Sequence, residues 1–241
     1  MNHIENKSVG CVRGRTGRLY SGIVFTGFEE ESYEIVPADS NNPPSQVISS
    51  APWARYSVRK VVFEDAIRPL STSCWFAGRG QYEQFNLKGL DTSRVTDMSY
   101  MFSRQYAEDC CYGPTELDLS GFDTSMVRDM SWMFGGCLVL SSVDISGWDT
   151  SRVEDMSLMF AHCYSLRSVD VSHFDTSRVA DMTGMFEESG IERLDLSGFD
   201  LSKTAAIRGM LWQCDCLRYL KIPEWEPAMI ATLRTMLLRP Q

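Results

Sequence analysis

The chain has 241 residues, of which 44% are hydrophobic, with a formal net charge of −9 at pH 7 and a pI of about 4.9. This composition supplies a core, but an acidic chain without a basic cluster lacks the electrostatic footprint of a nucleic-acid-binding protein. No apolar run reaches the length of a transmembrane helix, which argues against direct insertion into a membrane.

The N-terminal part contains no repeated motif. It is rich in glycine, serine and proline, and its segments around 19–28 and 32–36 are candidates for edge strands. We therefore predict an N-terminal cap of irregular β structure over residues 1–57. Its first residues, MNHIENKSVGC, have no apolar core of a signal peptide and no anchor, so a cytoplasmic location stays open.

One motif then recurs along the chain. It reads LDTSRVTDMSYMF at 90–102, FDTSMVRDMSWMF at 122–134, WDTSRVEDMSLMF at 148–160, FDTSRVADMTGMF at 174–186 and, in a worn copy, FDLSKTAAIRGML at 199–211. The steps between its first aspartates are 32, 26, 26 and 25 residues, so an insertion lies within 103–113. This period falls in the range of leucine-rich repeats.

Each repeat predicts a short strand and then a helix. Apolar, Asp, apolar and Ser residues alternate at 117–120, 143–146, 169–172 and 194–197, which is typical of a strand with one buried face. Apolar residues then recur at helical spacing, as in Val127, Met130, Met133, Phe134, Cys137 and Leu140. Such units bury their apolar faces only by stacking. We therefore predict an α/β leucine-rich-repeat-like solenoid with short parallel strands on one face and helices on the other.

The solenoid is predicted to span residues 58–222, with clear repeats over 85–219. Phe76 precedes Phe102 by 26 residues, which places a degenerate first repeat in register. After a last strand at 220–222, residues 223–241 are predicted to form a C-terminal capping helix. We expect one extended domain with a cap at each end.

The phrase DTSxVxDMSxMFxxC, followed by a leucine and an apolar-Asp-apolar strand, resembles the BspA-type leucine-rich-repeat family of bacterial surface proteins. PWARYSVRKVVFE at 52–64 is similar to the entry segment of that family. The resemblance implies an exported protein, often attached to the cell wall or to lipid, that serves adhesion or host contact. It supplies no catalytic residues.

Cysteines occupy one repeat position, at Cys137, Cys163 and Cys214, and Cys111 joins them if the insertion precedes it. A metal or disulfide ladder is one reading. However, the close paired spacing of zinc sites is absent, and neighbouring helices about 8–10 Å apart are too distant for easy disulfides. We expect buried thiols, with no cofactor and no metal.

The strand aspartates form a row that we call the strand-face acidic row: Asp118, Asp144, Asp170 and Asp195. A calcium ladder is one reading, although single carboxylates lack the roughly 6–8 oxygen ligands of a good site. A solvated acidic face, available to a partner, is the other reading. The motif aspartates Asp91, Asp123, Asp149, Asp175 and Asp200 are expected to bond nearby backbone amides, and Phe122, Trp148, Phe174 and Phe199 to form a buried ladder.

Catalysis would require a base beside a nucleophile. The neighbours His162 and Cys163 do not face one another on a helix, so we predict that the chain is not an enzyme. On the same helical geometry, the residue five after the first core valine lies opposite the core. It is Tyr100, Trp132 or Leu158 in three successive repeats and glycine in two others, and Tyr106 and Tyr112 of the insertion are expected nearby.

The repeats thus predict a scaffold whose function depends on residues that differ between copies. Our first hypothesis is a binding and adhesion module of a bacterial surface or secreted protein, which recognises a protein or glycan on a host or bacterial surface. A structural spacer without a ligand is the second, and an enzyme the third. The ligand, the export route and the oligomeric state are left open by the sequence.

Overall fold

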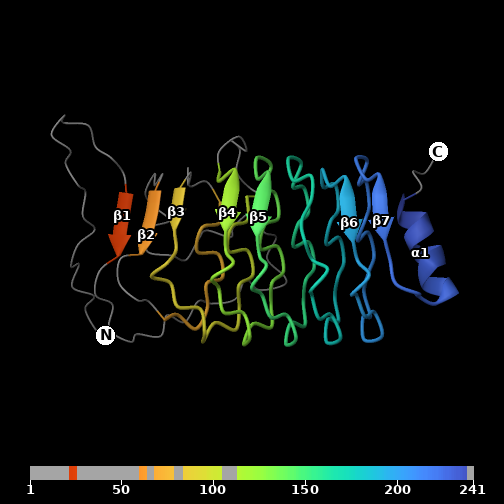
Figure 1. Ribbon diagram of the computed structural model, residues 1–241, viewed down its shortest axis with the longest axis horizontal. Helices are drawn as coiled ribbons and strands as arrows, with labels where there is room; N and C mark the ends of the chain where they lie inside the picture. Colours follow the sequence, from red (N-terminus) through yellow and green to blue (C-terminus); the bar gives the residue numbers. More distant parts are fainter. Residues whose placement is uncertain (1–21, 26–59, 64–67, 79–83, 105–112, 238–241) are drawn as a thin grey trace.

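The computed structural model describes residues 22–25, 60–63, 68–78, 84–104 and 113–237. Along this part of the chain the elements are β1 Gly22–Phe25, β2 Lys60–Phe63, β3 Gln84–Asn86, β4 Glu116–Asp118, β5 Ser142–Asp144, β6 Arg193–Asp195, β7 Tyr219–Lys221 and α1 Pro227–Leu237. The repeats follow one another along the long axis of the molecule, and α1 lies at the C-terminal end (Figure 1). Each repeat forms one coil of this stack.

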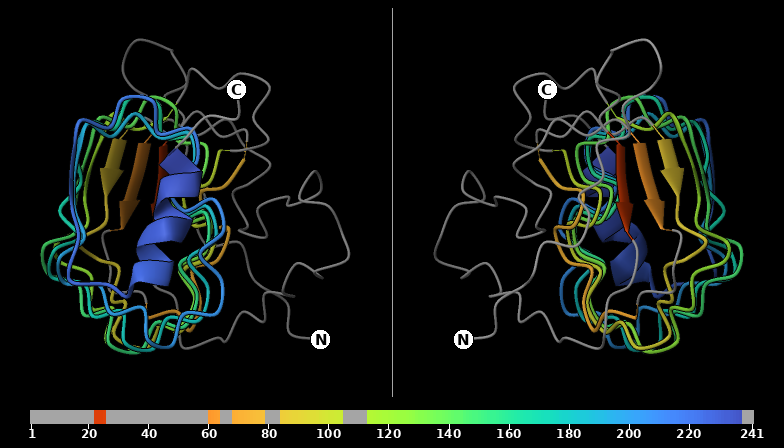
Figure 2. Two further views of the ribbon diagram at one scale, coloured as in Figure 1. Left: turned by 90° about the vertical axis from the view of Figure 1, so that its right-hand side faces the viewer. Right: turned by 90° about the vertical axis from the view of Figure 1, so that its left-hand side faces the viewer.

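The strands lie on one side of the stack (Figure 2). The pairs β1–β2, β2–β3, β4–β5 and β6–β7 are all parallel. The strands predicted from alternation are confirmed as β4, β5 and β6, each starting one residue earlier than expected. The segment 169–172 forms no strand, and its neighbourhood contributes only a bridge between Ser168 and Arg193.

The opposite side of the stack, here called the turn face, contains no α-helix in its described coils. It consists of turns and isolated bridges in residues 71–78, 97–104, 129–137, 155–163, 181–189 and 206–214. The predicted helices are therefore wrong. The amides of Met130, Trp132, Phe134 and Gly136 donate to carbonyls of the next coil, at Asp155, Ser157, Met159 and Ala161. An amide bonded to the neighbouring coil cannot form the i→i−4 bond of an α-helix.

Left-handed backbone conformations also interrupt any helix on the turn face. In one coil, φ is 57° at Trp132 and 77° at Gly136. The same two positions are left-handed in other coils, the first at Cys74, Tyr100, Leu158, Gly184 and Gly209, the second at Gly78, His162, Glu188 and Gln213. Because a right-handed helix needs negative φ throughout, one or two such residues per coil exclude it.

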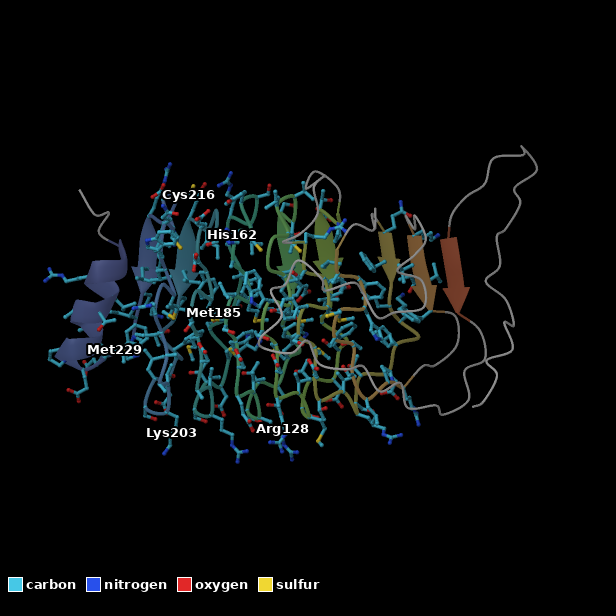
Figure 3. The ribbon with its side chains drawn as sticks, turned by 180° about the vertical axis from the view of Figure 1, so that it is seen from behind. Arg128, His162, Met185, Lys203, Cys216 and Met229 are labelled. Atoms are coloured by element: carbon cyan, nitrogen blue, oxygen red, sulfur yellow. The ribbon has the colours of Figure 1, made fainter. Side chains whose placement is uncertain are left out.

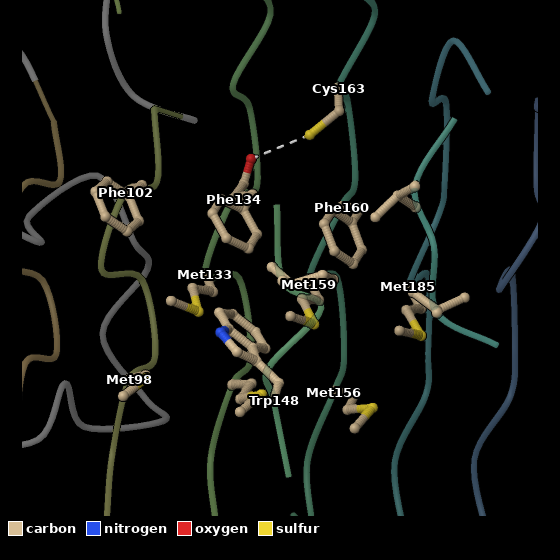
Figure 4. Packing of buried hydrophobic residues seen from close by; sticks show 14 of the residues in the cluster. Met98, Phe102, Met133, Phe134, Trp148, Met156, Met159, Phe160, Cys163 and Met185 are labelled. Atoms are coloured by element: carbon tan, nitrogen blue, oxygen red, sulfur yellow. Dashed lines mark hydrogen bonds between the residues drawn. The ribbon is translucent and has the colours of Figure 1, made fainter. Parts of the chain in front are cut away.

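The residues that suggested a helix nevertheless fill the core (Figure 4). Met130, Met133 and Phe134 are fully buried, and the ring of Phe134 stacks on that of Phe160 at 5.3 Å. Phe160 in turn stacks on Phe186 at 5.6 Å. The predicted buried ladder of Phe122, Trp148, Phe174 and Phe199 is confirmed, with exposed fractions of 2–5%. Phe76 stacks on Phe102 at 5.5 Å, which confirms the register of the first repeat.

The helix predicted near the C-terminus is confirmed as α1. Its Leu233 is buried and its Met229 packs against the core cluster. The indole of Trp225, just before α1, donates to the carbonyl of Phe199 at 3.2 Å. Helix α1 therefore covers apolar side chains of the last coil. At the other end, β1 lies within the predicted strand at 19–28, whereas 32–36 lies outside the described residues.

Candidate binding surface

The Asp-Thr-Ser motif forms the corner of each coil between the strand side and the turn face. The carboxylate of Asp149 accepts a hydrogen bond from the Ser151 amide at 2.9 Å, and the hydroxyl of Thr150 donates to the Asp175 carbonyl of the next coil at 3.0 Å. The bonds to serine amides recur at Asp91, Asp123, Asp175 and Asp200. We call these five aspartates the corner acidic row. Its predicted structural role is confirmed.

The strand-face acidic row lies at the surface of the strands and at the segment equivalent to a strand. Each carboxylate accepts a hydrogen bond from the amide of the serine two residues later, as Asp144 does from Ser146 at 3.0 Å. Hydrogen bonds from Ser197, together with Lys221 at 3.0 Å, hold the pKa of Asp195 down at about 2. The row thus has local partners. No group of His, Cys, Asp or Glu in the described part of the chain is arranged to hold a metal ion.

A third row of aspartates, which the sequence reasoning missed, runs along the turn face. Parallel bridges connect Asp97, Asp129, Asp155 and Asp181 in successive coils, and we call them the turn-face acidic row. All four side chains are half-buried, and each carboxylate accepts a bond from the amide two residues later. Among the described residues, no lysine, arginine or histidine is within ion-pair distance of them. Their negative charges are therefore stacked without a cation.

Burial is the main reason why the pKa values of Asp129 and Asp155 are raised above the ordinary value. Hydrogen bonds from Ser131 and Ser157 oppose this shift in part, and the charges of neighbouring aspartates add to it. A raised pKa means that the folded state binds the proton more tightly than the unfolded state. Ionisation of these carboxyl groups therefore lowers the stability of the fold. The loss develops as the pH rises from the pKa in the unfolded chain to the higher pKa in the folded chain.

Replacing Asp155 by asparagine is expected to stabilise the protein at neutral pH by up to about 1 kcal/mol, because it removes one of several stacked like charges. The asparagine oxygen can still accept the bond from the Ser157 amide. The gain should shrink as the pH falls to about 4, because the raised pKa of Asp155 leaves much of the wild-type carboxyl protonated there. Urea melts at both pH values measure this difference. A gain of the same size at both would contradict the charge explanation.

The repeated cysteines are buried thiols, as predicted. Cys163 donates its thiol hydrogen to the carbonyl of Phe134 in the preceding coil at 3.2 Å, and Cys137 does the same to Phe102. Burial raises the pKa of Cys137 to about 12 and that of Cys163 well above its usual value. These thiols remain protonated at neutral pH and act as weak donors between coils. Cys111 lies outside the described residues.

His162 lies next to an acidic side chain and not next to a nucleophile. Its Nδ1 lies 3.4 Å from Oε2 of Glu188, which also accepts a hydrogen bond from the Tyr164 hydroxyl at 3.0 Å. Cys163, the neighbour in sequence, points its thiol into the core (Figure 4). The two residues that raised the question of catalysis are thus not brought together as a base and a nucleophile.

The residues predicted to stand opposite the core, Tyr100, Trp132 and Leu158, do form a row on the turn face, which we call the apolar row. The rings of Tyr100 and Trp132 stack at 5.8 Å with an interplanar angle of 12°. This separation is smaller than the expected helix spacing, because hydrogen bonds rather than packed helices join the coils. All three side chains are half-buried. Tyr106 and Tyr112 lie outside the described residues.

The apolar row has an unusual backbone. Its residues have φ of 56–57°, a conformation that bulky side chains rarely adopt. Glycines take the same position in the next two coils, Gly184 with φ 59° and Gly209 with φ 67°. The coil therefore accepts a residue without a side chain here. Two glycines at one position within an apparent helix were the signal in the sequence that could have revealed this turn.

Comparisons with known proteins add a family but no activity. In the described residues, no helix is both long enough and apolar enough to cross a membrane. Searches of curated proteins and of solved structures found no match. A family described as "Mycoplasma protein of unknown function, DUF285" matches residues 70–137 and 108–225, more than half of the chain. The chain belongs to the DUF285 family.

Proposed function

We propose that the chain is a non-enzymatic binding and adhesion module of a bacterial surface or secreted protein, built as a leucine-rich-repeat-like solenoid of the BspA type. It recognises a protein or glycan on a host or bacterial surface through the turn face. The resemblance of the repeat motif to BspA-type proteins supports the surface location, and the stacking of the coils supports the solenoid.

The observation that carries this proposal is the apolar row. Each of its bulky side chains occupies a left-handed position that glycine takes in the next two coils, at Gly184 and Gly209. A non-glycine residue in this conformation costs on the order of 1 kcal/mol, and such strain gathers at functional sites. Trp and Tyr side chains are also typical anchors of protein interfaces. We infer that they are kept for contact with a partner.

A spacer without a ligand is the second candidate, because the hydrogen bonds of the Asp-Thr-Ser motif hold the corner of each coil and join it to the next coil. An enzyme is the weakest candidate. It would require metal-free protein to hydrolyse generic ester, peptide or glycoside substrates and to lose this activity in a His162→Ala variant.

The test is binding of the labelled chain to whole bacteria and to cultured host cells, compared with a double variant carrying Tyr100→Ala and Trp132→Ala. We expect at least about a tenfold loss of binding, since interface anchors carry most of the affinity. Urea melts should show nearly unchanged folding, because both side chains lie outside the core. Tyr219→Ala removes an exposed aromatic ring from the strand side and should leave binding unaltered.

Two outcomes would count against this proposal. Unaltered binding by the double variant would show that the apolar row is not the contact surface. Absence of binding to either kind of cell by the wild-type chain would favour the spacer.

A further inference from the structure

Two rows of residues run along the turn face, whose His162 is labelled in Figure 3. One is the apolar row. The other is the turn-face acidic row, whose members precede those of the apolar row by three residues in each coil. Asp129 thus accompanies Trp132, and Asp155 accompanies Leu158. The side chains of both rows are half-buried, so part of each reaches the surface of the turn face.

The acidic row differs from the two other rows of aspartates. In the strand-face acidic row, Lys221 pairs with Asp195, and in the corner acidic row Arg68 pairs with Asp91 at 2.7 Å. No such cation accompanies the turn-face row within the described residues. In neighbouring strands of a ladder, in-register residues are about 5 Å apart, where like charges repel. Burial is the main cause of the raised pKa values of Asp129 and Asp155, and the charges of the neighbouring aspartates add to it.

A lysine or arginine side chain from a partner fits this pair of rows. Its methylene stem is apolar and its charged end is hydrophilic, so the stem can pack on an aromatic ring while the end reaches a carboxylate. A cation close to Trp132 also gains from the electrons of the ring. Since the two rows continue over several coils, successive basic residues of one segment can use the same arrangement repeatedly.

We propose that the occupant of the turn face is a basic segment of a partner protein, in which lysine or arginine side chains contact the turn-face acidic row and intervening apolar side chains pack on the apolar row. This inference rests on the proposed function and narrows its partner to a protein. A neutral or acidic glycan offers no charge to the aspartates. Moreover, Tyr100 and Trp132 already stack on each other, which leaves fewer ring faces for a sugar.

The probe is a short fluorescent peptide that repeats Lys-Leu-Lys-Gly, with a repeat of Glu-Leu-Glu-Gly as its charge-reversed counterpart. Fluorescence anisotropy with the full chain measures their affinities. The test variant carries Asp129→Asn and Asp155→Asn, which keep the oxygen that accepts the serine amide bond. The control carries Asp123→Asn and Asp149→Asn in the corner acidic row. It changes the net charge equally and keeps the corresponding bonds.

We expect the basic peptide to bind and the acidic peptide to fail. The test variant should lose at least about tenfold in affinity, whereas the control should stay within about twofold, because only the first pair touches the peptide. Higher salt should weaken the binding. Equal losses in both variants would show a general effect of net charge and overturn the proposal. Equal binding of the two peptides, or none, would also overturn it.

The two proposals fail in distinguishable ways. If cell binding depends on Trp132 but the basic peptide does not bind, the adhesion function stands and the basic partner is wrong. If the peptide binds through Asp129 and Asp155 while cell binding is unaffected by the loss of Tyr100 and Trp132, the adhesion surface lies elsewhere.

Discussion

A Phe160→Ala variant is expected to lose about 3–5 kcal/mol of unfolding free energy, the usual cost of truncating a buried phenylalanine. Phe160 is fully buried, and its ring is stacked on both sides, on Phe134 at 5.3 Å and on Phe186 at 5.6 Å. Alanine would leave a cavity in the middle of this ladder. Because each coil contacts only its neighbours, the loss weakens the contacts on both sides at once.

Urea denaturation of the whole chain measures this loss, with Glu154→Ala in the same coil as the control. Glu154 is exposed and its ion pair with Arg128, 2.7 Å long, is exposed as well. Such pairs contribute under about 1 kcal/mol. If both substitutions had equal effects, the assignment of core and solvent sides in this coil would be wrong.

A Gly147→Ala variant is expected to cost about 1–3 kcal/mol, the usual range for overpacking. A Cβ at Gly147 would lie 2.2 Å from the carbonyl oxygen of Ser120 in the preceding coil, so the turn would have to move. His173 occupies this position in the next coil, which shows that such a turn can adjust and limits the cost.

Gly121→Ala provides the matched control. Gly121 has the same place in its own coil, yet a Cβ there would meet nothing within 4 Å. Thermal or urea melts should therefore show almost no effect for Gly121→Ala. A loss as large as that of Gly147→Ala would mean that both glycines are needed for backbone freedom rather than for close approach of the coils.

The strand side of the stack was predictable because alternation of apolar and polar residues has one simple structural reading. Leu117 and Leu194 point inward in β4 and β6, as their period predicts. The core residues of the turn face were predictable for a different reason. Any coil that must pack against its neighbours repeats its apolar residues at fixed positions, whatever backbone conformation joins them.

The backbone of the turn face was not predictable from apolar spacing alone. Steps of three residues fit a helix, but consecutive turns place Met130, Met133 and Phe134 in the core equally well. What decides between them is where the amides bond, and in this protein they bond to another coil. The adjacent Gly135 and Gly136, which disfavour a helix, are a signal in the sequence that apolar spacing alone does not use.

The sequence predicted part of the candidate binding surface. Helical geometry placed Tyr100, Trp132 and Leu158 opposite the core, and the structure places them at the surface on a non-helical backbone. Helical spacing also predicts ion pairs of Asp97, Asp155 and Asp181 with the arginines three residues earlier, and no such pair forms among the described residues. As members of a helix, Asp129 and Asp155 would have stood in the first turn, where an acid is favourable. Only the pairing of coils reveals that these charges are stacked.

The direction of the hydrogen bonds between coils gives the whole stack an electrical polarity. On the turn face, Met156, Leu158, Phe160 and His162 donate their amides forward to the next coil, while Ala180 donates backward to Glu154. Forward bonds thus outnumber backward ones, and the same imbalance recurs from coil to coil. Aligned peptide dipoles add as they do in a helix, so partial positive charge collects at the C-terminal end and negative charge at the other.

In the last coil the corresponding forward amides belong to Ile207, Gly209, Leu211 and Gln213, which have no following coil among the described residues. This end offers donors, whereas the backward-facing end of any such coil offers acceptors. Two stacks of this kind cannot join like end to like end through the ladder, because donors would meet donors. In this chain helix α1 packs its Met229 and Leu233 on the core at this end.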